Sequence, residues 1–91
     1  MNLKHFSFKT TDPVAAQLDA LRPLNTADVV ERLNKLKPAL ADATFAGLSD
    51  ERAINVLEAP ELLRAPQLLQ ALPRPRRARV LEGMADDRAA D

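Results

Sequence analysis

Two carboxylates near the end of the chain are the residues best suited by type and spacing to do chemistry. Asp87 and Asp91 lie four residues apart, so on a helix both side chains would project from one face. Magnesium takes oxygen ligands, keeps several waters and commonly uses only one or two carboxylates. The pair could therefore hold a hydrated ion weakly if a neighbouring domain supplied further ligands. The alternative is structural, because acids in the first turn of a helix are ordinary caps and dipole partners.

The parts of an enzyme are missing from the sequence. His5 is the single histidine, and with no cysteine or paired acid beside it a zinc site is not indicated. Ser7 and Ser49 lie in no recognisable motif with a base, and Gly47 and Gly83 are too few to build a glycine-rich phosphate loop. We therefore expect the chain not to be an enzyme.

The one basic cluster is residues 73–79, Pro-Arg-Pro-Arg-Arg-Ala-Arg. No aromatic residue is interleaved for base stacking, and the 13 basic and 13 acidic residues of the chain cancel to zero net charge. Nucleic-acid binding is therefore not expected. The cluster is interpreted as a solvated helix face, with docking on an acidic neighbouring domain as the alternative.

Length and composition indicate one small, soluble helical domain. The chain has 91 residues, of which 46% are hydrophobic, mostly Ala and Leu, and 3% are aromatic. Ala and Leu are strong helix formers. Cysteine is absent, which excludes disulfides and thiolate metal sites. No apolar run approaches the roughly 18 residues that a membrane-spanning helix needs.

Prolines and capping residues divide the chain into short helices. Helix starts are predicted at Asp12-Pro13, at Asn25 or Thr26, at Pro38, at Ser49, near Pro66 and after Pro75. The predicted inward-facing residues are Val14, Leu18 and Leu21; Val29, Leu33 and Leu36; Ala41, Phe45 and Leu48; Ala53, Val56 and Leu57; Leu68, Leu69 and Leu72; and Val80, Leu81 and Met84. Gly83 is expected to end the last of these helices, and Asp86 to cap another that begins there. Residues 1–11, with Phe6 and Phe8 on one side, are predicted to form an extended arm.

The helical part repeats itself. Residues 48–58 match residues 72–82, with Leu, Arg, Val, Leu and Glu in register, so the unit is 24 residues long (72 minus 48). A unit of that length holds two short helices, and stacked units of this kind form a helical array. We therefore predict an all-α fold, a superhelical array or α-solenoid over residues 12–91. Because no C-cap or closing polar turn follows Asp86-Asp87, the domain is interpreted as a C-terminally truncated fragment.

The order and spacing of four motifs resemble those of a known family. They are Leu-x-x-x-Asp-Val-Val-Glu-Arg-Leu at 24–33, Glu-Arg-Ala-x-x-Val-Leu at 51–57, Leu-Pro-x-x-Arg-Arg-Ala-x-Val-Leu-Glu-x-Met at 72–84 and Asp-Asp-Arg-Ala-Ala-Asp at 86–91. Together they resemble the N-terminal cytoplasmic domain of MgtE-type magnesium transporters and channels. The resemblance covers residues 20–91. The middle domain of the flagellar rotor protein FliG shares this kind of repeat and remains a competing resemblance.

The resemblance to the transporters implies a regulatory domain on the cytoplasmic side of the inner membrane. In that family, paired CBS domains and a membrane pore follow in the same chain, and the full-length protein is a homodimer. Magnesium bound between the N domain and the CBS domains closes the pore, and acidic surfaces repel each other when magnesium falls. The Mg²⁺ cofactor would thus be regulatory, weakly held and dependent on the CBS domains.

The resemblance also assigns particular residues. Aligning residues 81–84 with the family places Asp87 and Asp91 on the acidic pair that faces the CBS domains. Asn55 departs from the pattern, because transporters can carry a glutamate there and a neutral amide is a weaker magnesium ligand. Glu58 and Glu82, which are equivalent in the repeat, are expected to point to solvent. The competing function is that of a FliG-like adaptor, which would bind protein partners through an exposed apolar groove and ignore magnesium.

Overall fold

The computed structural model describes the backbone of residues 12–90 and the side chains of residues 12–84. The described part of the chain is all helical, as the sequence predicted. The helices are α2 (Pro13–Leu21), α3 (Thr26–Lys35), α4 (Pro38–Ala46), α5 (Asp50–Glu58), α6 (Ala65–Gln70) and α7 (Arg74–Ala90). The predicted arm of residues 1–11, with Phe6 and Phe8, lies outside the described residues.

Side-chain caps and prolines start α2, α3, α4 and α5 where the sequence predicted, whereas α7 begins at Arg74, one residue before Pro75. Asp12 Oδ1 accepts hydrogen bonds from the N–H groups of Val14 and Ala15, at 3.1 and 3.2 Å, and so caps α2. Of the two candidate caps of α3, Asn25 is the one used, since its Oδ1 accepts from the Asp28 N–H. Ser49 Oγ accepts from the Arg52 N–H and caps α5. Each cap satisfies a donor that the first turn of a helix leaves free.

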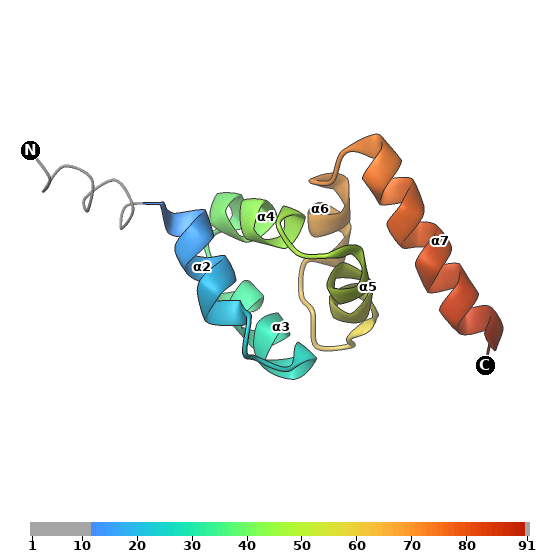
Figure 1. Ribbon diagram of the computed structural model, residues 1–91, viewed down its shortest axis with the longest axis horizontal. Coiled ribbons are helices and arrows are strands. Elements are labelled where there is room, and N and C mark those ends of the chain that lie inside the picture. Colours follow the sequence, from blue (N-terminus) through green and yellow to red (C-terminus); the bar gives the residue numbers. More distant parts are fainter. Residues whose placement is uncertain (1–11, 91) are drawn as a thin grey trace, which may run out of the picture.

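The helices are arranged in two stacks, because each helix packs against the next but one. Helices α2, α4 and α6 form one stack, and α3, α5 and α7 form the other. Along the long axis of the molecule, α2 and α3 lie at one end and α7 at the opposite end (Figure 1). This arrangement agrees with the predicted helical array, in which short helices bury their apolar faces on their neighbours.

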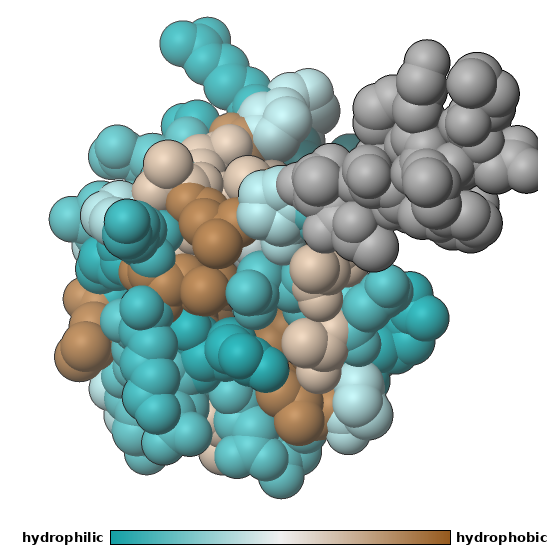
Figure 2. All heavy atoms as spheres, turned by 90° about the vertical axis from the view of Figure 1, so that its left-hand side faces the viewer, coloured by the Kyte–Doolittle hydropathy of each residue, from teal (hydrophilic) through white to brown (hydrophobic). Residues whose placement is uncertain are grey.

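The core lies between the two stacks and follows the apolar positions predicted from the sequence. The buried hydrophobic residues are Leu21, Val29, Val30, Leu33, Ala41, Phe45, Leu48, Ala53, Val56, Leu68, Leu72 and Val80. Phe45 on α4 is the largest side chain in this set that is fully buried. Figure 2 looks at the α2 end of the array, where hydrophobic atoms are visible between hydrophilic side chains.

Each 24-residue unit consists of two similar halves of twelve residues. Leu21, Leu33 and Phe45 follow one another at intervals of twelve and are all almost completely buried. Leu24, Leu36 and Leu48 have the same spacing, and each lies in the segment that follows a helix, after α2, α3 and α4 respectively. The twelve-residue half is one short helix with its connection.

The predicted helix break near Gly83 is wrong. Helix α7 is continuous from Arg74 to Ala90, so Asp86 lies inside it and is not an N-cap. Gly83 lies against α5: a Cβ atom at this position would overlap Ile54 Cδ1, the far end of a side chain, so a larger residue would require Ile54 to shift. Glycine lowers the helix propensity of position 83, but here it allows α7 to approach α5 closely, and the helix continues.

Candidate functional site

Of the predicted acidic pair, Asp87 alone belongs to a described helix, near the end of α7. Asp87 is a helical residue of α7, its side chain lies beyond the described side chains, and Asp91 lies outside the described residues. Asn55 lies on α5 and is exposed, and Glu58 and Glu82 are exposed as expected. Among the residues whose side chains are described, no cluster of three or more His, Cys, Asp or Glu residues could hold a metal ion.

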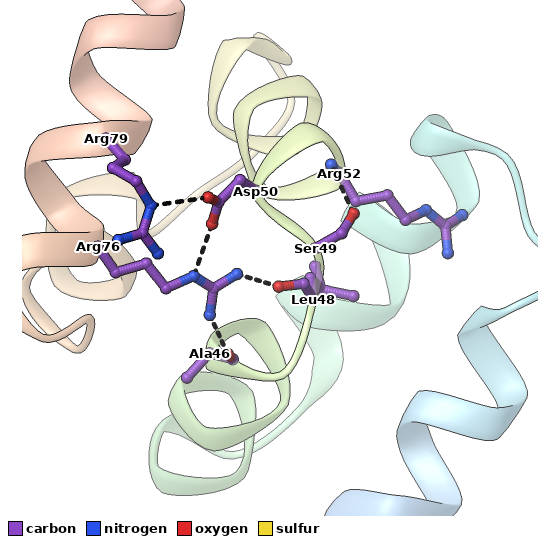
Figure 3. A network of polar contacts seen from close by, with 7 residues as sticks. All are labelled: Ala46, Leu48, Ser49, Asp50, Arg52, Arg76 and Arg79. Carbon is purple, nitrogen blue, oxygen red and sulfur yellow. Dashed lines mark hydrogen bonds and ion pairs between the residues drawn. The ribbon is translucent and has the colours of Figure 1, made fainter.

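Two arginines of the basic cluster, Arg76 and Arg77, are partly buried, which corrects the interpretation of the cluster as a solvated face, while Arg74 and Arg79 are exposed. Arg76 reaches from α7 across to the junction of α4 and α5, where its guanidinium donates to the carbonyl groups of Ala46 and Leu48. Its Nε donates to Asp50 Oδ1 at 2.8 Å (Figure 3). Arg77 donates to the carbonyl groups of Gln70 and Leu72 at the end of α6, at 3.3 and 3.1 Å. These arginines hold the array together.

Asp50 joins α5 to α7 by bonding two arginines at once. Besides Arg76 on Oδ1, the carboxylate accepts from Arg79 Nε on Oδ2 at 3.1 Å (Figure 3). The hydrogen bonds from Arg76 and then Arg79 lower the pKa of Asp50 below its ordinary value of 3.8. The carboxylate is therefore charged throughout the neutral range, and it also lies in the first turn of α5, where the helix dipole favours negative charge.

Two more arginines bind helix ends in the same way as Arg76. Arg52 donates to the carbonyl groups of Leu21 and Leu24 after α2. Arg64 Nη2 donates to those of Leu33 and Leu36 after α3, at 3.1 and 2.9 Å. We call this arrangement, one guanidinium donating to two carbonyl groups at the C-terminal end of a helix, an arginine clamp. Each clamp supplies donors to carbonyl groups at the negative end of a helix dipole; those of Leu21 and Leu33 also accept from the backbone N–H groups of Leu24 and Leu36.

The sequence contains a signal for these clamps, which the interpretation of residues 73–79 as a solvated face did not use. Arg52, Arg64 and Arg76 are spaced by twelve residues, in step with Leu24, Leu36 and Leu48. A periodic arginine within a periodic apolar pattern indicates a structural role for the charge. Local charge density alone, which dominates residues 73–79, does not distinguish a clamp from a solvated arginine.

An apolar groove lies between α5, α6 and α7. Its lining residues are Leu57, Ala65, Pro66, Leu69, Leu81 and Met84. Leu81 was predicted to face the core, but 45% of it is exposed. Leu63, in the connection before α6, is 75% exposed.

The groove follows from the place of these residues in the array. Leu57, Leu69 and Leu81 continue the twelve-residue series of Leu21, Leu33 and Phe45. The first three members of the series are buried, Leu57 and Leu69 are half-buried, and Leu81 is exposed. The burial of this series therefore decreases toward the α7 end.

Comparison with known protein families matches residues 24–91 to the MgtE intracellular N domain. No curated protein and no solved structure matches the chain. Of the helices that the structure describes, none has both the length and the apolar character to cross a membrane. The family match starts at Leu24, after α2, and spans α3 to α7 together with the acidic pair. Since this match covers most of the chain, the protein belongs to the family of MgtE intracellular N domains, a family of magnesium transport proteins.

Proposed function

We propose that the chain is the regulatory, magnesium-sensing domain of an MgtE-type transporter or channel and has no catalytic activity of its own. The observation that carries this proposal is the family match over residues 24–91. The partners would be the CBS domains and the membrane pore of the same parent chain, on the cytoplasmic side of the membrane, within a homodimer.

Asp87 and Asp91 are the residues that would hold the ion. Support comes from α7, which continues through Asp87 as a helix to Ala90. Residues four apart on a helix share one face, and carboxylates on one face suit a hydrated magnesium ion with few protein ligands. Bound magnesium would supply the positive charge that lets this acidic face approach an acidic surface of the CBS domains.

Such a site acts by favouring one of two arrangements. Without the ion, like charges on the N domain and the CBS domains repel each other. With it, the compact arrangement has the higher affinity for magnesium, so a rising concentration shifts the equilibrium towards that arrangement and towards the closed pore. The exposed amide at Asn55 would provide a weaker ligand than a carboxylate, so Asp87 and Asp91 would carry the main share of sensing.

The test is magnesium-dependent closure in the parent transporter. The double variant Asp87→Asn with Asp91→Asn should need a higher magnesium concentration to close, measured as ion flux against internal magnesium. Glu82→Gln is the matched control, because Glu82 is an exposed carboxylate on the same helix. Closure at an unchanged magnesium concentration in the double variant would refute the sensing role of the pair.

The second candidate function is an adaptor that binds protein partners, and the apolar groove favours it. Leu81 presents an exposed apolar side chain to solvent in this groove. An adaptor would lose its partner on Leu81→Lys and would be unaffected by Asp87→Asn with Asp91→Asn. The sensor should show the opposite pattern, so the two sets of variants distinguish the functions.

A further inference from the structure

The apolar groove between α5, α6 and α7 is the fourth in a series of equivalent surfaces, spaced by twelve residues. The first three are covered, because α5 packs on α3, α6 on α4 and α7 on α5. One position of the series shows the difference: Val29, Ala41 and Ala53 are completely buried, whereas the equivalent Ala65, which lines the groove, is only half-buried. The groove is therefore a place for a covering helix that the described part of the chain does not fill.

Each covering helix carries an arginine at its start and an aliphatic residue four positions later. The pairs are Arg52 and Val56 for α5, Arg64 and Leu68 for α6, and Arg76 and Val80 for α7. Each arginine clamps the end of an earlier helix, and each aliphatic residue is at most 1% exposed. Residues four apart lie on one face of a helix, so a single face supplies both the clamp and a core side chain.

The C-terminal end of α5 is the end that the next covering helix would clamp. After α2, α3 and α4, the backbone N–H of Leu24, Leu36 or Leu48 donates to a carbonyl group three residues earlier. The equivalent residue after α5 is Pro60, which has no N–H to donate. The carbonyl groups of Leu57 and Pro60 accept no hydrogen bond from the residues that the structure describes.

The end of α5 also has negative groups of its own. Glu58 in the last turn and Glu61 after Pro60 are both exposed, and the C-terminal end of a helix dipole is negative. A guanidinium complements this end in charge, and its planar set of five donors suits two carbonyl groups. A lysine ammonium, a compact point charge, would match them less well.

We propose that the groove binds a short amphipathic helix of a partner protein, which has an arginine in its first turn and a leucine or valine four positions later. The arginine donates to the carbonyl groups of Leu57 and Pro60. The aliphatic side chain packs into the groove beside Leu69 and Leu81. The partner helix thus takes the place on α6 that α7 takes on α5.

A second copy of this chain does not carry the required arginine at its opposite end. That end of the array is formed by α2 and α3 (Figure 1). At further intervals of twelve residues, the positions equivalent to the clamp arginines are Asp28 in α3 and Ala16 in α2. Alanine has no side-chain donor, and aspartate would bring another negative charge to the end of α5. The chemistry of the site therefore favours a different protein as the partner.

This proposal goes beyond magnesium sensing and deepens the second candidate function, because it gives the chemistry of the partner. It is tested with the 91-residue chain and a capped synthetic peptide of residues 48–59 as the probe. The peptide contains the Arg52 and Val56 pair and the Ser49 helix cap. Titration followed by NMR of the isotope-labelled chain should give saturable shifts at the groove residues Leu57, Leu69 and Leu81.

Two pairs of variants test the clamp and the groove separately. The peptide with Arg52→Gln should bind about tenfold more weakly than the native peptide, because it lacks two charged hydrogen bonds. In the chain, Leu81→Lys should abolish binding of the native peptide. Leu63→Lys is the matched control and should leave binding unchanged, because Leu63 is 75% exposed and does not line the groove.

Three results would overturn the proposal. The first is the absence of saturable shifts at millimolar peptide. The second is equal binding of the native and Arg52→Gln peptides, which would leave an apolar groove without a clamp. The third is self-association of the chain that Leu81→Lys abolishes, which would assign the groove to a second copy.

The proposed functions can fail independently of this partner. Magnesium sensing is judged by ion flux in the parent transporter, which the peptide titration does not measure. If Leu81→Lys removes a protein partner in the cell but the peptide does not bind, the adaptor function stands and the proposed chemistry of its partner is wrong.

Discussion

Asp50 has two functions that depend on its charge. Its carboxylate lies at the start of α5, where a negative charge is favoured, and it receives hydrogen bonds from Arg76 and Arg79 on α7. Arg76 is the more buried of the two arginines and also clamps the end of α4. One carboxylate therefore links three helices, and its ionisation should be visible in the stability of the whole chain.

We predict that Asp50→Asn lowers the Tm at neutral pH and that the difference from the native chain disappears in acid. The pKa of Asp50 is lowered in the folded chain from its ordinary value of 3.8. A lowered folded pKa gives stability that is present above the unfolded pKa and lost as the pH falls through the folded pKa. Thermal melts from neutral pH down to about pH 2 measure it. Glu58→Gln, at an exposed position of α5, is the control; a difference in Tm that persists unchanged in acid would contradict the prediction.

At the residue scale, the sequence was informative about local contacts and uninformative about distant ones. The caps Asp12, Asn25 and Ser49 could be predicted because each acts on backbone groups two or three residues away. The partners of Arg76 and Arg52 lie 26 to 31 residues away. Such contacts depend on how the helices stack, and only the twelve-residue spacing of the arginines indicates them.

At the scale of the element, α2 to α6 are short, and none of them ends with a left-handed glycine; Gly47, the C-cap residue of α4, has a φ of −85°. No residue in the described part of the chain has a positive φ, so no left-handed residue closes a helix there. The last carbonyl groups need other donors, and the arginine clamps supply them. A helix in this array is thus completed by a side chain from a later helix, and its end is stable only when the stack is assembled.

We predict that Arg52→Gln lowers the free energy of unfolding by about 2 kcal/mol, because it removes two charged hydrogen bonds, to the carbonyl groups of Leu21 and Leu24. Urea unfolding followed by circular dichroism measures the change. Arg22→Gln is the matched control: Arg22 forms an ion pair with Asp19 whose side chains are 79% and 71% exposed, so its loss should cost less than about 0.5 kcal/mol. Equal losses in the two variants would show that the clamp adds nothing to stability.

The length of α7 shows why a helix boundary could not be predicted correctly from local sequence. A glycine followed by two aspartates predicted a stop at Gly83 and a new start at Asp86, since both patterns are typical of helix ends. The structure continues α7 through both, and Gly83 lies against Ile54 on α5. A contact of that kind with α5 cannot be predicted from the residues of α7 alone.

At the scale of the whole molecule, residues at equivalent positions of the repeat differ in how deeply they are buried. The periodic pattern predicted the fold class and most of the core, because each twelve-residue half repeats the same apolar positions. It predicted Leu81 as a core residue for the same reason, and there it was wrong. Leu21 on α2 and Phe45 on α4 are fully buried, whereas the described side chains of the groove at the α7 end leave 45% of Leu81 exposed.

This difference in burial gives a prediction for two members of the twelve-residue series. Phe45 is fully buried in the middle of the array, so Phe45→Ala should cost about 3–5 kcal/mol and lower the Tm of the whole chain. Leu81 holds the equivalent position but is 45% exposed, so Leu81→Ala should cost less than about 1 kcal/mol. Urea unfolding monitored by circular dichroism compares both variants with the native chain. A large loss for Leu81→Ala would mean that the groove is covered in solution, for instance by a second copy. Sedimentation of the native chain at increasing concentration would then reveal association, and its absence together with a small loss would establish the groove as a free surface.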